Sequence, residues 1–340
     1  MTKNSISRRN FLKLTSVGLA GLFVNPKHRK SNQFSNQQGR VIYDTIQAFD
    51  IPSFNGNITH QYWSDTIIPI SEVTIGDDEP NYNRVWYRIN DIGYTHSGGV
   101  QPVKTIPQDP IAAIPESGQL AEVSVPYTDA RWRPDFNRNA VYRCYYETTH
   151  WVTDLIYDDN SRPWYRILDD KWDLILSVQA EHLRLIPNQE LQTISPNVPA
   201  DAKRLEVRTS DQIVIAYEWD RPVFMTRAAT GAEFSNGKFY TPHGRHFTFH
   251  KRPSRHMAAG NLAHNGYDLP GVPWICYITE KGVAFHGTYW HNDYGRPRSH
   301  GCINLTPRAA KWIYLWTLPS VPAQEQRTYE LYGGTKVDVF

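Results

Sequence analysis

Cysteine is scarce in this chain, with three residues in 340: Cys144, Cys276 and Cys302. An odd number excludes a framework in which every cysteine forms an intramolecular disulfide, so at least one thiol is free. Cys144 in "VYRCYYE" and Cys276 in "WICYIT" lie in apolar, strand-like runs, where cysteine acts as a small buried hydrophobe. Cys302 in "SHGCINL" instead follows a glycine and lies two residues after a histidine, neighbours that a cysteine buried only for packing does not need.

Strong charge of one sign is also missing, because the formal net charge is only +2 and the charges are spread evenly. Nucleic-acid binding needs a concentrated basic face, so we expect no nucleic-acid partner. Hydrophobic residues make up 40% of the chain and charged residues 21%, which excludes wholesale disorder and allows a packed core. The 11 tryptophans and 20 tyrosines favour short β-strands over long helices.

The N-terminus contains no apolar run long enough to span a bilayer stably, since residues 14–24 are too few. This run follows Arg8, Arg9 and a Phe-Leu-Lys segment, and the whole resembles a twin-arginine export signal. The alternative is a basic amphipathic start to a cytosolic protein. We expect residues 1–40 to be an export signal and linker, and the protein to reach the cell envelope or the extracellular cell wall. No small-x-small cleavage site stands out, so cleavage and retention as a membrane tether both stay open.

Two stretches resemble each other, residues 84–104 and 162–186. Both contain Trp-Tyr-Arg-Ile followed by an acidic turn, which predicts a duplicated β-unit whose strands alternate their faces. The stretches resemble bacterial SH3-like domains, small barrels found in cell-wall enzymes. The resemblance implies one SH3-like domain over 41–110 and a second over 111–190, with cell-wall polymers as further binding partners.

A turn-rich stretch with three prolines, residues 187–204, predicts a domain boundary. The remainder, 203–340, has the pattern of a mostly-β domain that opens with two strands and polar turns near Thr209–Asp211 and Asp220–Pro222. Only "TPRAAKWIYLWT", residues 306–317, has a helical pattern.

That helix has clear signals at its start. Thr306 is suited to cap it and Pro307 to occupy its first turn. Trp312 and Trp316 are four residues apart and therefore share a face.

The residues around Cys302 are those that a nucleophilic thiol requires. A thiol attacks a carbonyl as thiolate, so it needs an imidazole within reach, a group that holds the imidazole, and backbone N–H groups for the oxyanion. His286 ends the strand-like "GVAFHG", where the Gly287 carbonyl is available to orient its ring. Gly301 lets a substrate approach the backbone closely. The polar, aromatic loop 288–298 is suited to cover the cleft.

His286-Gly287-Thr288, Ser299-His300-Gly301-Cys302 and Asn304 resemble the catalytic segment of the L,D-transpeptidase (YkuD) family of peptidoglycan enzymes. Residues 205–231 resemble the opening hairpin of that family, and Thr241, Pro242 and Gly244 resemble its Thr-Pro-x-Gly loop. The resemblance covers about 203–340 and implies a β-sandwich with one short helix. One extra residue before Phe247 and a short loop ahead of Ser299 depart from the family pattern and leave substrate preference open.

The resemblance implies a role for each site residue. Cys302 would be the nucleophile and His286 its base, with His300 the rival candidate for base. The Gly287 carbonyl would hold the His286 ring, Ser299 and His300 would shape the pocket, and the N–H groups of Gly301 and Cys302 would stabilise the tetrahedral intermediate. Asn304 and Arg308 would brace the site.

Four loop residues allow two interpretations each. Arg296 and Arg298 either grip substrate carboxylates or belong to a solvated loop. Tyr289 and Trp290 either line the cleft or pin the loop.

The activity implied is that of a cysteine acyltransferase without a cofactor, acting in cell-wall organisation and cell shape. It would cleave the amide after the third residue of a stem tetrapeptide, release D-alanine and form 3→3 cross-links. Water as acceptor would give an L,D-carboxypeptidase, and a lipoprotein acceptor an anchoring transpeptidase.

Two other classes compete with this interpretation. Histidines are frequent between 243 and 300, and His246 and His250 have the His-x-x-x-His spacing of a zinc hydrolase. The intervening "FTF" is strand-like and contains no acidic base, so we expect no metal site. A non-catalytic cell-wall-binding module would have no use for the Ser-His-Gly-Cys segment.

Overall fold

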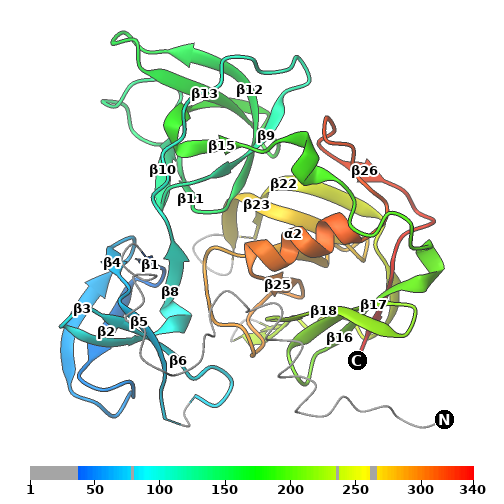
Figure 1. The fold of residues 1–340 in the computed structure, drawn as a ribbon, viewed down its shortest axis with the longest axis horizontal. Helices are drawn as coiled ribbons and strands as arrows, with labels where there is room; N and C mark the ends of the chain where they lie inside the picture. The colour runs from blue at the N-terminus through cyan, green and yellow to red at the C-terminus, as the bar shows by residue number, and fades with distance from the viewer. Residues whose placement is uncertain (1–36, 78–79, 235–236, 261–265) are drawn as a thin grey trace.

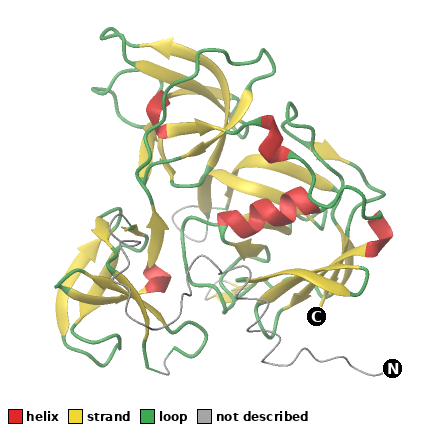
Figure 2. Ribbon diagram, viewed as in Figure 1, coloured by secondary structure: helices red, strands yellow, loops and turns green. Residues whose placement is uncertain are grey.

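The computed structural model describes residues 37–77, 80–234, 237–260 and 266–340, so the expected export signal lies outside the described residues. Strands dominate this part of the chain, and α2 (Pro307–Trp316) is its single α-helix (Figures 1 and 2). The predicted mainly-β class with one short helix is confirmed. Among these residues, no helix combines the length and apolar character that crossing a bilayer requires.

The first group of paired strands is called here the first β-unit and comprises β1–β8, drawn in blue to cyan in Figure 1. A three-stranded sheet has the order β4-β1-β8 and a five-stranded sheet the order β3-β2-β7-β6-β5. The strands are β1 (Gln38–Val41), β2 (Thr45–Phe49), β3 (Ile58–Trp63), β4 (Ile67–Pro69), β5 (Glu72–Ile75), β6 (Val85–Ile89), β7 (Gly93–His96) and β8 (Val100–Val103).

The second β-unit comprises β9–β15, with a five-stranded sheet in the order β14-β13-β12-β9-β15 and the hairpin β10-β11. The strands are β9 (Gln119–Val123), β10 (Tyr127–Ala130), β11 (Tyr142–Tyr145), β12 (Thr149–Tyr157), β13 (Pro163–Asp169), β14 (Leu174–Gln179) and β15 (Leu183–Leu185).

The two Trp-Tyr-Arg-Ile segments form β6 and β13, and each is the middle strand of an antiparallel trio, β5-β6-β7 and β12-β13-β14. The strand prediction is confirmed, and the side chains alternate between two faces that are both covered. Trp86 and the adjacent Tyr87 are both buried, and so are Trp164 and Tyr165. In β6 the reason is that both faces are covered: Trp86 packs edge-on against Phe49, while Tyr87 joins the apolar core of the first β-unit.

The C-terminal domain contains two five-stranded sheets, β18-β17-β16-β27-β21 and β25-β24-β23-β22-β26, and the short pair β19-β20. The strands are β16 (Lys203–Arg208), β17 (Ile213–Glu218), β18 (Arg221–Arg227), β19 (Glu233–Phe234), β20 (Gly237–Lys238), β21 (Gly244–Phe247), β22 (His250–Ala259), β23 (Tyr267–Tyr277), β24 (Ala284–Gly287), β25 (Ile303–Leu305), β26 (Thr328–Tyr329) and β27 (Lys336–Val339). The opening segment thus forms three strands where the sequence pattern suggested two, because the chain reverses at both polar turns.

Helix α2 packs between these two sheets (Figure 1). Thr306 caps it by accepting a hydrogen bond from the Ala309 N–H at 3.3 Å, as predicted. Trp312 stacks on Phe224 of β18 with ring centroids 4.1 Å apart, and on Trp316 at 5.5 Å. The shared tryptophan face is therefore what attaches the helix to the first sheet.

The stretch 187–204 separates two groups of paired strands, but it does not separate two cores. Leu120, Trp151 and Ile186 of the second β-unit belong to the same buried cluster as Leu205 and Phe285 of the C-terminal domain. The second β-unit therefore packs directly on the C-terminal domain.

Candidate active site

Cys302 lies where a glycine turn enters strand β25. In the parallel pair β24–β25, Phe285 faces Ile303 and His286 faces Asn304. Side chains alternate along a strand and paired residues point to the same side, so the side chain of Cys302 emerges on the same face as that of His286. The register thus directs Cys302 and His286 to the same face of the sheet.

The Cys302 thiol is half-buried, whereas Cys144 and Cys276 are fully buried as predicted. Its Sγ donates a weak hydrogen bond to the Gly282 carbonyl at 3.6 Å. Burial raises the pKa of the Cys302 thiol to about 11, against a smaller opposing effect of the Ala284 N–H. The raised pKa favours the neutral thiol form of Cys302 at neutral pH.

The His286 ring is buried and neutral. Burial lowers the pKa of its imidazole to about 4, and the hydrogen bond to the Gly287 carbonyl only partly opposes this. Nδ1 lies 3.0 Å from the Gly287 oxygen, as expected from the sequence. Because a carbonyl only accepts, Nδ1 carries the proton and Nε2 has a free lone pair, the tautomer that a general base needs.

Gly287 has to be glycine because of close packing. A Cβ at this position would lie 2.7 Å from Pro273 Cγ and 2.9 Å from the Cα of Pro307 at the start of α2. The residue that orients His286 is therefore itself fixed between a strand and the helix.

The turn before Cys302 is held by Ser299. Its Oγ donates to the Cys302 carbonyl at 2.5 Å and accepts from the Gly301 N–H at 3.1 Å. Gly301 has φ +110°, a conformation that favours glycine. The Gly301 N–H is thus already engaged and cannot serve an oxyanion as predicted. Outside the strand ladders, the Cys302 N–H has no acceptor among the described residues, so it is the donor that remains for this role.

His300 is exposed and its ring is held by aromatic groups. It stacks on Phe234 with centroids 4.8 Å apart and meets Phe239 edge-on at 4.6 Å. Burial by these neighbours lowers its pKa. Within the described part of the chain, Cys302 Sγ is hydrogen-bonded to neither histidine ring, but the strand register favours His286 over His300 as its partner.

Tyr289 and Trp290 begin the loop 288–298, called here the active-site loop. Tyr289 is buried, stacks on Tyr145 of the second β-unit at 5.2 Å and donates its hydroxyl to the Pro270 carbonyl at 3.1 Å. Trp290 lies against the His286 ring, with centroids 5.7 Å apart. Tyr289 therefore pins the loop, while Trp290 packs on the His286 ring.

Arg296 and Arg298 bind the protein itself. Both donate to Asp293 Oδ2, at 2.6 and 2.8 Å, and Arg298 also donates to the Tyr43 hydroxyl at 2.7 Å. These contacts anchor the active-site loop and favour a structural role of the two arginines over the substrate grip.

Asn304 and Arg308 lie in different environments. Asn304 is buried, and its side-chain amide is hydrogen-bonded to Nε2 of His291 at 3.0 Å. Arg308 is mostly exposed and pairs with Glu147 of the second β-unit at 3.0 Å, so it braces a domain contact and not the site.

His291 and Tyr267 were missed by the sequence analysis. Burial lowers the pKa of His291 to about 3, which keeps the ring neutral, and its Nδ1 accepts from the Asp293 N–H at 3.3 Å. Tyr267 lies beside His300, with ring centroids 5.9 Å apart, and its pKa is raised by burial and by the nearby Cys302. No local motif marks either residue, because their roles depend on strand register.

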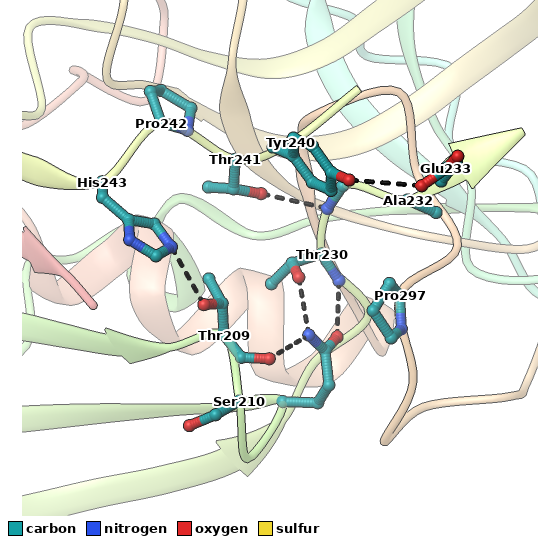
Figure 3. Close-up of a pocket in the computed structure, with 12 residues that line it drawn as sticks. Thr209, Ser210, Thr230, Ala232, Glu233, Tyr240, Thr241, Pro242, His243 and Pro297 are labelled. Atoms are coloured by element: carbon teal, nitrogen blue, oxygen red, sulfur yellow. Dashed lines mark hydrogen bonds between the residues drawn. The ribbon is translucent and has the colours of Figure 1, made fainter. Parts of the chain in front are cut away.

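The Thr-Pro loop joins the nucleophile turn to a pocket of about 730 Å³ (Figure 3). Thr241 Oγ1 donates to the Gly301 carbonyl at 2.9 Å and accepts from the Gly231 N–H at 3.0 Å. The pocket is lined mostly by uncharged residues: Thr209, Ser210, Gln212, Thr230, Gly231, Ala232, Glu233, Tyr240, Thr241, Pro242, His243 and Pro297.

The histidines of the zinc alternative are separated in the fold. His246 belongs to β21 and hydrogen-bonds the Pro242 carbonyl, whereas His250 belongs to β22 of the other sheet and stacks on Tyr277. Among the described residues, no group of three or more histidine, cysteine or acidic side chains is arranged to hold a metal ion.

Comparison with known proteins gives a family match for the C-terminal domain. Residues 202–339 match the family described as the L,D-transpeptidase catalytic domain. Comparison with curated proteins gives no match.

Several solved structures are similar to parts of the chain. A mutant L,D-transpeptidase of Enterococcus faecium is 22% identical over 41% of this chain and 50% of its own, with a TM-score of 0.31. An L,D-transpeptidase of Xylanimonas cellulosilytica is 20% identical over 47% and 72%, with a TM-score of 0.30. One of Mycobacterium smegmatis is 17% identical over 81% and 100%, with a TM-score of 0.33. The chain thus spans only half of the Enterococcus structure. The family match and the residues of the site together identify residues 202–339 as an L,D-transpeptidase catalytic domain.

Proposed function

We propose that this protein is a peptidoglycan L,D-transpeptidase in which Cys302 is the nucleophile and His286 the general base. The observation that supports the proposal best is the strand register, which directs the half-buried Cys302 thiol and the His286 imidazole to the same face of β24 and β25. The Gly287 carbonyl fixes the tautomer whose Nε2 can accept the thiol proton.

The reaction would proceed through a thioester. As Sγ attacks the carbonyl of the third stem residue, His286 Nε2 takes the thiol proton, and the Cys302 N–H donates to the developing oxyanion. The amide C–N bond then breaks, and the imidazolium returns the proton to the leaving amine of D-alanine. An amine of a neighbouring stem peptide attacks the thioester, loses a proton and releases Cys302, which gives a 3→3 cross-link.

The acceptor defines the alternatives within this chemistry. Water in place of the amine gives an L,D-carboxypeptidase, and a lipoprotein amine gives an anchoring enzyme. All three share the acyl-enzyme, so they differ only in the second half-reaction.

Mass spectrometry of products from disaccharide-tetrapeptides tests the proposal. We expect dimers that lack one D-alanine, and a covalent adduct on Cys302 after incubation with a carbapenem. Cys302→Ala should lose both, whereas Cys276→Ala, a change at a buried thiol away from the site, should keep both. Tripeptides alone would indicate carboxypeptidase action, and a folded enzyme without any adduct would contradict the nucleophile.

The same purified protein also distinguishes the transpeptidase from a zinc hydrolase and from a pure binding module. A zinc hydrolase would lose activity with a chelator and keep it after thiol alkylation, the reverse of our expectation. A pure binding module would keep its full biological effect in Cys302→Ala.

The N-terminal half suggests an envelope location. We infer export by the twin-arginine route from Arg8 and Arg9, and binding of cell-wall polymers by two SH3-like β-units. Replacing both arginines by lysine should leave the protein in the cytoplasmic fraction. The full chain with Cys302→Ala should sediment with purified sacculi, and its failure to do so would argue against wall binding.

A further inference from the structure

Arg40 of β1 joins three parts of the molecule at one point. Its Nη2 donates to the Tyr289 carbonyl of the active-site loop at 2.6 Å, and its Nη1 pairs with Asp65 at 2.8 Å. The guanidinium also lies 3.9 Å above the ring of Tyr145, which belongs to the second β-unit. Tyr145 in turn stacks on Tyr289.

This arginine is 2% exposed, so its charge is almost fully removed from water. Burying a charge costs free energy unless its hydrogen bonds are satisfied, and hydrophobic residues often replace such pairs without loss of stability. Here Gln101 accepts from both Nε and Nη2, at 3.1 and 2.9 Å. The planar fork is therefore held in one orientation, with one N–H directed at the loop.

The loop contact is close to the reacting groups. Tyr289 follows Gly287 by two residues, and Gly287 supplies the carbonyl that orients His286. Tyr289, Trp290 and Cys302 also pack in the same apolar cluster. A shift of the Tyr289 backbone would therefore loosen the base and admit water to the thiol.

The first β-unit holds the same loop at a second place. The Tyr43 hydroxyl accepts from Arg298, and the Asn292 N–H donates to the Gly98 carbonyl at 3.2 Å. Together these contacts hold both ends of the active-site loop.

We infer that Arg40 is a positioning residue for catalysis, through which the two N-terminal β-units hold the active-site loop in the geometry that His286 and Cys302 require. The inference rests on the proposed function for its turnover readout only. The β-units are then a structural part of the active site, besides any role in binding the wall.

The test compares Arg40→Met with Arg88→Met in the full chain. Arg88 lies in the same β-unit, but its ion pair with Glu72 is exposed. For Arg40→Met we expect kcat for D-alanine release from disaccharide-tetrapeptides to fall about tenfold, with KM within about twofold, because the loss concerns the transition state. Arg40→Lys should recover only part of kcat, since an ammonium lacks the planar fork.

Alkylation by iodoacetamide, followed by intact mass, provides the second readout. Arg40→Met should alkylate faster at pH 8 and gain a single adduct, on Cys302, because hydration of the cluster brings the thiol pKa toward its ordinary value. A purely structural defect would slow turnover without this opposite change. Arg88→Met should match the wild type in both measurements.

The outcomes separate the two proposals. If the wild type releases no D-alanine, the proposed function fails, and the alkylation readout alone decides about Arg40. Wild-type kcat and alkylation in Arg40→Met would overturn the inference. If Arg40→Met instead gains three adducts, it has unfolded, and Arg40→Lys decides: a lower kcat with a single adduct supports the inference, and wild-type behaviour overturns it.

Discussion

At the scale of single residues, the site combines a neutral thiol with a neutral imidazole. Burial moves the two pKa values apart, raising that of Cys302 to about 11 and lowering that of His286 to about 4. Such a pair does not exchange its proton before substrate arrives. In the mechanism that we propose, proton transfer would then accompany attack on the carbonyl.

Alkylation of Cys302 should therefore depend steeply on pH. The raised pKa means that the thiolate fraction grows as pH rises, about tenfold for each unit between pH 7 and 10, whereas an ordinary cysteine levels off near ~8.5. Intact-mass measurement of the iodoacetamide rate checks this, with Cys302→Ala as the blank. A rate that is already constant at pH 7 would instead indicate a stable thiolate–imidazolium pair.

At the scale of secondary-structure elements, the site depends on how closely α2 approaches β24. Thr306 caps the helix immediately after β25, and Pro307 packs against Gly287. The helix start thereby fixes the strand end that carries the base.

Replacing Gly287 by alanine should push the start of α2 away from the end of β24. The added Cβ would meet Pro273 and Pro307 at under 3 Å, so we expect a loss of about 1–3 kcal/mol of stability from overpacking. We also expect the rate of D-alanine release to fall at least about tenfold. A displacement of His286 by about 1 Å would misalign it with the thiol, and such misalignment can lower the rate of an enzyme by about 100-fold.

Gly333→Ala is the matched control. Gly333 has φ +86° and no heavy atom within 4 Å of the added Cβ, so this change should cost about 1 kcal/mol of backbone strain and leave turnover intact. Wild-type turnover in Gly287→Ala would show that the contact with α2 does not orient His286.

At the scale of the whole molecule, ionic contacts attach the second β-unit to the C-terminal domain. His256 of β22 lies between Asp169 Oδ2 and Asp268 Oδ1, each 2.5 Å away. Asp170 pairs with Arg252 and Arg255 beside it. Burial lowers the pKa of His256, but the hydrogen bonds to the two aspartates outweigh it and the pKa is raised.

The stability of this contact should fall as pH rises. A raised histidine pKa contributes stability that is complete below the unfolded value near ~6.5 and disappears as pH passes through the folded value. We expect the Tm of the wild type to decrease between pH 6 and 9 and that of His256→Gln to change less. Thermal unfolding across this range checks the difference, and parallel curves for the two proteins would refute it.

The sequence by itself determined the features that depend on neighbours in the chain. The cap and tryptophan face of α2, the buried Cys144 and Cys276, and the bond from His286 to Gly287 all follow from residues close in sequence. Short-range spacing fixes such contacts because the backbone geometry between them is nearly constant.

Only the tertiary structure decided what Arg298, Arg308 and the Gly301 N–H do, and it alone revealed Arg40. Arg40 and Tyr289 are separated by 249 positions, and nothing near either residue indicates the other. Contacts of this kind arise when separately formed sheets pack together, so their partners are set by the shape of the packed units and not by local pattern. The motif around Cys302 could be read from the sequence because it is local, whereas the residues that support it come from distant parts of the chain.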